Sequence, residues 1–297
     1  MNKFAAGALC SALCAWLTLG VAAAAETPKK ASAKSTKAAP ATQAAPVEEP
    51  KDAATLEFEK ARAEMEASNP AELFEMTGED LWNAKRGPKN VSLAETCDLG
   101  LGVGKLEGAY VAMPRFFADG NAVMDAERRI VWCMVEKQGF KFEDIAKKPF
   151  AKDTYTPEQT SLVTFVAAKS KNMKFAVPVS DPKVKEAYEI GKEIFSYRAG
   201  PYDFSCSTCH GAGNKRIRMQ MLPNLSSTSG ALTGVQGWPG YRMTGGVMLT
   251  YQWRLSDCFR QQRFPEPKYV SDALADLMTY VTANANGEIY KGPGIKR

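Results

Sequence analysis

The sequence is poor in histidine, because His210 is the only one in 297 residues. A zinc site, which needs more ligands than one histidine and a nearby pair of cysteines, is therefore disfavoured. Strand-like alternation of apolar and polar residues is also scarce, which argues against an all-β fold. Basic residues form no dense run, so we expect no nucleic-acid partner.

The net charge is small, +5, but it is unevenly spread. From Gly191 to the C-terminus, 13 Lys and Arg stand against 7 Asp and Glu, whereas the preceding 190 residues hold 25 against 26. This basic part suits an anionic substrate or an acidic protein partner. The length of the chain allows two compact domains, and a hydrophobic content of 45% is sufficient for packed cores.

Residues 1–25 have the pattern of a signal peptide. Lys3 precedes an apolar stretch, and Ala23 and Ala25 provide small residues at a cleavage-like site before Glu26. The uncharged stretch is 22 residues long, so a membrane anchor is the alternative. We expect export to the periplasm, cleavage, and no membrane span in the mature protein.

Cysteine is the second informative residue type. Cys10 and Cys14 lie inside the predicted signal peptide and would be lost with it. Five cysteines then remain: Cys97, Cys133, Cys206, Cys209 and Cys258. In an oxidising compartment, an odd number leaves at least one thiol without a disulfide partner, and such a thiol is reactive or a ligand.

Residues 26–52 are mostly Ala, Pro, Lys, Thr and Glu without an apolar period, which predicts a disordered linker. Folded sequence is expected from about Ala53. Thr156, followed by proline and Gln159, predicts a capping box, and Asp181, also followed by proline, predicts a second helix start. Together these patterns predict a mostly α fold.

The chain also repeats itself. At an offset of 125 residues Cys133 aligns with Cys258, and at an offset of 109 Cys97 aligns with Cys206. A third block, 162–166, matches apolar residues 115 positions later. Three blocks in the same order indicate two tandem copies of one domain, with loops of different length.

Cys206, Cys209 and His210 form a C-x-x-C-H pattern. Two thiols three positions apart reach the two vinyl groups on one porphyrin edge, and the imidazole of the next residue reaches the iron. The pattern predicts one covalently attached haem c. The alternatives are a redox dithiol, which would want a βαβ context, and half a zinc site.

In the first copy, a glycine and a leucine stand where the second cysteine and the histidine would be. We therefore expect a haem-less cytochrome c-like domain at 53–178 and a haem-binding cytochrome c domain at 179–297. Cys97 is expected to form a disulfide with Cys133, closing a loop of 36 residues. Two separate free thiols are the alternative.

With no second histidine, the sixth iron ligand must be Met, Cys, Lys or a chain terminus. Met243 and Met248 are the methionine candidates and would leave a simple electron carrier. Cys258 is the rival, because Arg254 precedes it by one helical turn and Arg260 follows it closely, a setting that favours a thiolate. We favour Cys258.

The C-x-x-C-H motif at 206–210 and the segment 251–261 resemble the SoxA family, the larger cytochrome subunit of the bacterial Sox pathway for thiosulfate oxidation. The resemblance runs from about Ala53 to the end of the chain. It implies that Cys258 is a haem ligand modified to a persulfide and that Arg254 helps to bind substrate. Family members keep haems in both domains or have a disulfide in place of the first.

The resemblance also implies the reaction of an L-cysteine S-thiosulfotransferase. Thiosulfate is joined to a cysteine thiol of a carrier protein as a cysteine S-thiosulfonate, and two electrons pass to haem. The implied partners are a small haem cytochrome, the X subunit, in a heterodimer, and a carrier protein pair with a reactive cysteine.

Further basic residues are expected to steer anions, although solvated surface charges are the plain alternative: Arg242, Arg260, Lys215, Arg216 and Arg218. Two other classes of function are left open by the residues alone. One is a cytochrome with histidine and methionine ligands that only transfers electrons, and the other is a haem-based sensor.

Overall fold

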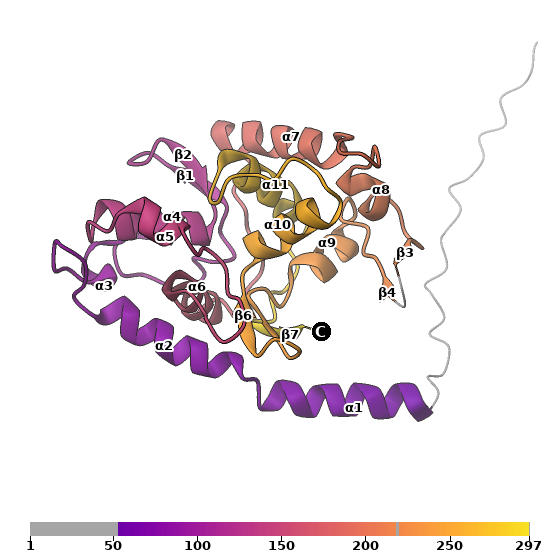
Figure 1. Cartoon of the computed structure of the whole chain (residues 1–297), viewed down its shortest axis with the longest axis horizontal. Coiled ribbons are helices and arrows are strands. Elements are labelled where there is room, and N and C mark those ends of the chain that lie inside the picture. The colour runs from indigo at the N-terminus through magenta and orange to yellow at the C-terminus, as the bar shows by residue number, and fades with distance from the viewer. Residues whose placement is uncertain (1–52, 218–219, 297) are drawn as a thin grey trace, which may run out of the picture. The chain divides into compact units, whose positions relative to one another are not determined.

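The computed structural model describes residues 53–217 and 220–296 (Figure 1). The predicted signal peptide, 1–25, and the predicted linker, 26–52, lie outside the described residues. The described part of the chain is mostly helical, as predicted, and its strands are two or three residues long. None of its helices is long and apolar enough to cross a membrane.

The first half of the folded chain is built on a helix pair, α2 packed across α6. Its elements are α1 (Ala53–Ala67), α2 (Ala71–Asn83), α3 (Leu93–Thr96), β1 (Arg115–Phe117), β2 (Ala122–Met124), α4 (Ala126–Glu136), α5 (Phe142–Ala146) and α6 (Glu158–Ala168). The apolar faces of these helices enclose a core that includes Leu93, Ile130, Leu162 and Val166.

The second half contains an equivalent pair, α7 packed across α11 (Figure 1). Its elements are α7 (Pro182–Ser196), α8 (Cys206–His210), β3 (Arg216–Ile217), β4 (Gln220–Met221), α9 (Thr228–Val235), β5 (Gly240–Arg242), β6 (Val247–Leu249), α10 (Tyr251–Gln261), α11 (Asp272–Ala283) and β7 (Gly294–Lys296). Its core includes Phe195, Leu274, Leu277 and Val281.

The two halves share the order of their main elements, although α5 occurs only in the first and β3, β4 and α9 only in the second. In the first, the antiparallel hairpin β1–β2 leads directly into α4, and in the second the antiparallel hairpin β5–β6 leads directly into α10. The register of the two hairpins also agrees. Phe116 pairs with Val123 in the first, and the residues 125 positions later, Tyr241 and Met248, pair in the second. The second hairpin gains β7 as a parallel third strand.

Both helix crossings need a glycine at the point of closest approach. A Cβ on Gly78 would lie 2.1 Å from the Ser161 carbonyl oxygen of α6, and one on Gly191 would lie 2.0 Å from the Asp276 carbonyl oxygen of α11. Backbone therefore packs directly on backbone in each half, and no larger residue fits without moving a helix.

The predicted helix starts have different outcomes. Asp181 caps α7 as predicted, because its Oδ1 accepts the backbone N–H groups of Lys183 at 2.8 Å and Val184 at 3.3 Å. The predicted capping box before α6 is wrong, since the N-cap of that helix is Pro157. The side chain of Gln159 instead donates to the Pro149 carbonyl at 3.1 Å, so it does not reach back to the cap.

The predicted disulfide between Cys97 and Cys133 is confirmed, and it ties the end of α3 to α4. Both cysteines are fully buried in the first core. On the same helix, Arg129 is bound to Asp119 at 2.8 Å and lies over the ring of Phe117 at 4.1 Å. Arg129 therefore has a structural place in this half.

Removing this cross-link should destabilise the protein. Closure of a 36-residue loop is worth about 4 kcal/mol in the unfolded-chain model. We expect Cys97→Ala/Cys133→Ala to lower the free energy of unfolding by about this amount in a denaturant titration. Wild-type protein with the disulfide reduced is the control, because it loses the cross-link but keeps both cysteine side chains. A decrease in the free energy of unfolding of less than about 1 kcal/mol would contradict the expectation.

The crossing of α7 and α11 makes a second prediction. Gly191→Ala should lower the free energy of unfolding by about 1–3 kcal/mol, because the methyl group meets a backbone oxygen that belongs to another helix. Gly213→Ala is the matched control, since a Cβ there has nothing within 4 Å. Equal denaturation midpoints for the two variants would show that the crossing of α7 and α11 has room for a methyl group.

Candidate functional site

The C-x-x-C-H motif forms the single helical turn α8, and its own polar residues fix that turn. The Ser205 side chain accepts the Thr208 backbone N–H at 3.2 Å, and the Thr208 hydroxyl accepts the Ser205 N–H at 2.9 Å. This capping box holds Cys206 and Cys209 three positions apart on a helix. Both cysteines are free thiols and are half-buried.

The ring of His210 is oriented by the backbone. Its Nδ1 lies 2.9 Å from the Pro223 carbonyl oxygen, so an Nδ1–H donates there and leaves Nε2 as the basic nitrogen. Burial lowers the pKa of His210, and the charge of Arg254 lowers it further, against the opposite effect of the Pro223 hydrogen bond. The neutral imidazole, which is the form that binds a metal, is favoured.

Next to Cys206 lies a largely apolar cavity of about 330 Å³, within the size range of cofactor sites. It is lined by Ile190, Glu193, Ile194, Tyr197, Ala199, Cys206, Phe259, Phe264 and Pro265. Apolar walls, two free thiols and an oriented imidazole fit a covalently bound haem. Within 53–217 and 220–296, no group of three or more His, Cys, Asp or Glu gathers to hold a metal ion.

Helix α10 places the second part of the site. Arg254 and Cys258 are one turn apart on this helix, and Arg254 Nη2 donates to Cys258 Sγ at 2.9 Å. Cys258 is a half-buried free thiol, and it is close enough to Cys206 and Cys209 to interact with both electrostatically. The structure therefore brings Cys258, Arg254 and the α8 motif together, as the sequence predicted.

One expectation about Cys258 is wrong. The neighbouring arginines were expected to favour its thiolate, but burial is the larger effect and raises the pKa of this thiol. Arg254 lowers the pKa only in part, and the charge of Asp257 adds to the rise. Arg260 gives no direct help, because its guanidinium binds Asp257 at 2.5 Å.

Asp257 is a residue of the candidate site that sequence reasoning missed. It is only 7% exposed, and its carboxylate accepts hydrogen bonds from Arg254 at 3.0 Å, Arg260 at 2.5 Å and Gln261 at 2.6 Å. Asp257 therefore holds the Arg254 guanidinium in place beside Cys258. The spacing i, i+3 between Arg254 and Asp257 was the available signal.

The methionine candidates lie in the second hairpin: Met243 is 52% exposed after β5, and Met248 is fully buried on β6. Among the proposed steering residues, Lys215 and Arg216 are exposed, Arg218 lies outside the described residues, and the Arg242 guanidinium lies over the ring of Trp253 at 5.5 Å. Arg242 is thus next to the residue that precedes Arg254.

A protein-family model, described as SoxA/TsdA, cytochrome c domain, matches residues 77–175. This match lies in the first half of the folded chain and does not include the C-x-x-C-H motif. A cytochrome c domain implies covalently bound haem c.

Curated relatives cover most of the chain. L-cysteine S-thiosulfotransferase subunit SoxA from Hydrogenophilus thermoluteolus is 45% identical over 240 residues, which is 81% of this chain and 87% of the relative. A protein of the same name from Hydrogenobacter thermophilus is 31% identical and covers 77% of this chain and 82% of its own length.

A chain from the crystal structure of SoxXA from P. pantotrophus superposes with a TM-score of 0.64 at 25% identity. The match covers 80% of this chain and 84% of that chain. Sequence and fold thus agree over both halves. The chain belongs to the SoxA family, the L-cysteine S-thiosulfotransferase subunits of thiosulfate oxidation.

Proposed function

We propose that this chain joins thiosulfate to a cysteine thiol of a carrier protein, with Cys258 as the reactive sulfur and Arg254 as the substrate clamp. The carrier S–H bond breaks and a sulfur–sulfur bond to thiosulfate forms, which releases one proton and two electrons. The observation that carries the proposal is the 2.9 Å contact between Arg254 and Cys258 beside the α8 motif.

One haem c would be held by thioether bonds to Cys206 and Cys209, with His210 Nε2 and Cys258 as ligands to the iron. When bound, it would supply a one-electron acceptor, so the two electrons would leave singly and pass on to the haem of the X subunit. Support comes from the Nδ1 hydrogen bond to Pro223, the apolar cavity beside Cys206 and the closeness of Cys258 to both α8 thiols.

Arg254 has the geometry of an anion clamp. Its Nη1 is bound to Asp257 and its Nη2 to Cys258, while 38% of its side chain is exposed. A guanidinium carries five N–H donors, so further donors are free for a small dianion. Thiosulfate held there would present its sulfur to Cys258, and a persulfide on Cys258 would offer a polarisable sulfur for exchange.

We further propose that the two halves are tandem cytochrome c-like domains, 53–178 and 179–297, of which only the second keeps a haem. The shared order of elements, the glycine at each helix crossing and the family match to 77–175 support duplication. In the first domain, the disulfide between Cys97 and Cys133 would take the place of the haem as a covalent cross-link.

The partners and location are also proposals. The P. pantotrophus neighbour was solved as SoxXA, which supports a heterodimer between this chain and a small haem cytochrome, the X subunit. A carrier protein pair would bring its reactive cysteine to Cys258. We place the protein in the periplasm, with 1–25 as a cleaved signal peptide and 26–52 as a linker.

The role of Cys258 is tested by Cys258→Met with the haem attached. Thiosulfate-dependent reduction of the cytochrome, measured with the carrier protein, should fall by a factor on the order of 10³ or more, because a thioether can form no persulfide. An absorption spectrum of the variant typical of a haem with a methionine ligand would show that the haem site itself survives. Undiminished turnover would remove the catalytic role proposed for Cys258.

The role of Arg254 is tested by Arg254→Ala. Loss of a charged hydrogen-bond donor should lower kcat/KM for thiosulfate roughly 10- to 100-fold, while the haem spectrum stays nearly intact. Arg260→Ala is the control, because Arg260 also binds Asp257 but is 64% exposed. Equal losses in the two variants would mean that Arg254 only serves to order Asp257.

A further inference from the structure

The two halves meet where the helices α4 and α10 begin. Gln252, in the first turn of α10, donates from Nε2 to Oδ2 of Asp125, the N-cap residue of α4, at 2.7 Å. Gln252 is fully buried and Asp125 is 1% exposed. This is a buried hydrogen bond between the haem-less half and the helix that carries Arg254 and Cys258.

The contact belongs to a nearly symmetric interface. Lys174 and Ile289, which are 115 positions apart, face each other in an antiparallel bridge. Their neighbours Phe175 and Tyr290, with the same offset, pack edge to face with ring centroids 5.6 Å apart. Pairing of equivalent residues is the mark of a two-fold, isologous contact, so the halves pack like two subunits of a dimer.

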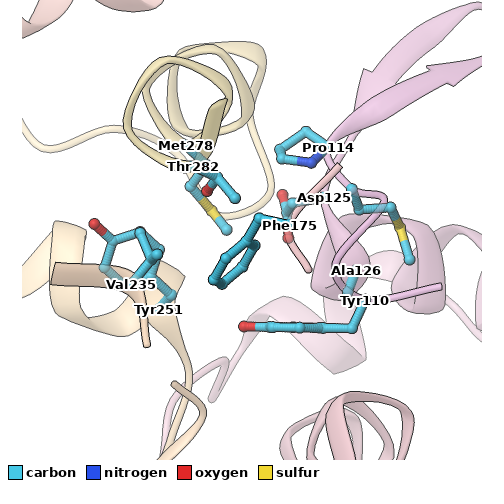
Figure 2. A pocket seen from close by; sticks show the side chains of 10 residues that line it. Tyr110, Pro114, Asp125, Ala126, Phe175, Val235, Tyr251, Met278 and Thr282 are labelled. Carbon is cyan, nitrogen blue, oxygen red and sulfur yellow. The ribbon is translucent and has the colours of Figure 1, made fainter. Parts of the chain in front are cut away.

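Figure 2 shows Asp125 at this interface, beside a cavity of about 20 Å³ that is large enough for one water molecule. Residues from both halves line it, including Tyr110, Asp125 and Phe175 from the first and Val235, Tyr251 and Met278 from the second. Tyr251, the residue before Gln252, is among them. The start of α10 is therefore packed against the first half on more than one side.

Each polar atom of the pair has a defined partner. Asp125 Oδ1 accepts the N–H groups of Glu127 at 2.9 Å and Arg128 at 3.3 Å, which leaves Oδ2 for Gln252. Gln252 Oε1 accepts the Val270 N–H at 3.2 Å. Gln252 thus fastens α10 both to the first half and to the segment before α11.

Two further contacts lie alongside. Tyr269 donates to Oε1 of the buried Glu127 at 2.8 Å, and Arg128 pairs with Asp272, whose side chain is exposed, at 2.7 Å. Burial raises the pKa of Glu127 to about 8, helped by the charge of Asp125 and opposed by the hydroxyls of Thr250 and Tyr269. The first turn of α4 is therefore also tied to the segment before α11 and to the first residue of α11.

We propose that the haem-less half positions the active-site helix α10, and with it Arg254 and Cys258, through the buried hydrogen bond from Gln252 to Asp125. The inference rests on the proposed function of those two residues. Gln252 fixes the first turn of α10, and Cys258 lies about 9 Å further along the helix axis. A small rotation or slide of α10 would therefore move the sulfur relative to α8, and errors of about 1 Å can cost 100-fold in rate.

The test uses holoprotein of the full chain. Gln252→Leu should lower kcat for thiosulfate-dependent reduction roughly 10- to 100-fold and change the haem absorption and EPR signature, at temperatures where the protein is folded. Gln138→Leu is the matched control. Gln138 is also a fully buried glutamine, but it donates to the Val91 carbonyl in the first half, far in sequence from α10.

A reciprocal exchange keeps the test decisive if Gln252→Leu does not fold. Gln252→Glu places two carboxyl groups against each other, and Asp125→Asn places two amides against each other. The double variant restores the hydrogen bond in the opposite direction, with the donor at 125 and the acceptor at 252, and leaves the total charge unchanged. Each single variant should change turnover and the haem signature, and the double variant should recover both.

Equal melting-temperature losses in Gln252→Leu and Gln138→Leu, with unchanged turnover and spectra in both, would overturn the proposal and leave a merely structural bond. The proposal would also be overturned if the losses of turnover in Gln252→Glu and Asp125→Asn simply added in the double variant. Failure of the proposed function is a different result: Cys258→Met would keep full turnover, whatever the Gln252 variants do.

Discussion

The proposed chemistry of this site depends on one short contact, the Arg254 guanidinium against the Cys258 sulfur. Both residues lie on the same face of α10, and Asp257 holds the guanidinium from the other end. Because burial and the charge of Asp257 raise the pKa of the thiol, the positive group beside it is the main local influence that favours the sulfur anion. The remaining parts of the site, the α8 thiols and the oriented His210 ring, are arranged around this pair.

The first half uses the same framework with other partners for the matching residues. Arg129 and Cys133 stand 125 positions before Arg254 and Cys258, yet the arginine is buried in an ion pair with Asp119 and the cysteine lies in a disulfide. The matching pair is thus buried in the first half and partly exposed in the second. The helix crossing with its glycine is kept in both halves, since it determines the fold rather than the reaction.

Much of this could be predicted from sequence because the signals were local. The C-x-x-C-H spacing, the Arg254–Cys258 spacing and the single leftover cysteine are short patterns with direct chemical meaning. The protonation preference of Cys258 was not predictable, because it depends on burial by residues far away in sequence. Asp257 was overlooked beside its arginines, and the bond from Gln252 to Asp125 spans 127 positions, which no local pattern reveals.

The carboxylate of Asp257 has a consequence for how an anion reaches the site. The Asp257 carboxylate lies 3.0 Å from Arg254 and 2.5 Å from Arg260, so the three side chains together carry a net charge of +1. Asp257 thereby offsets one of two positive charges, and the attraction of a distant anion scales with the net charge. In its proposed role Arg254 acts on an anion at contact range, whereas the scattered basic residues of the second half would act at longer range. Salt screens the longer-range attraction more strongly, so the encounter rate and the binding of the anion would respond differently to salt.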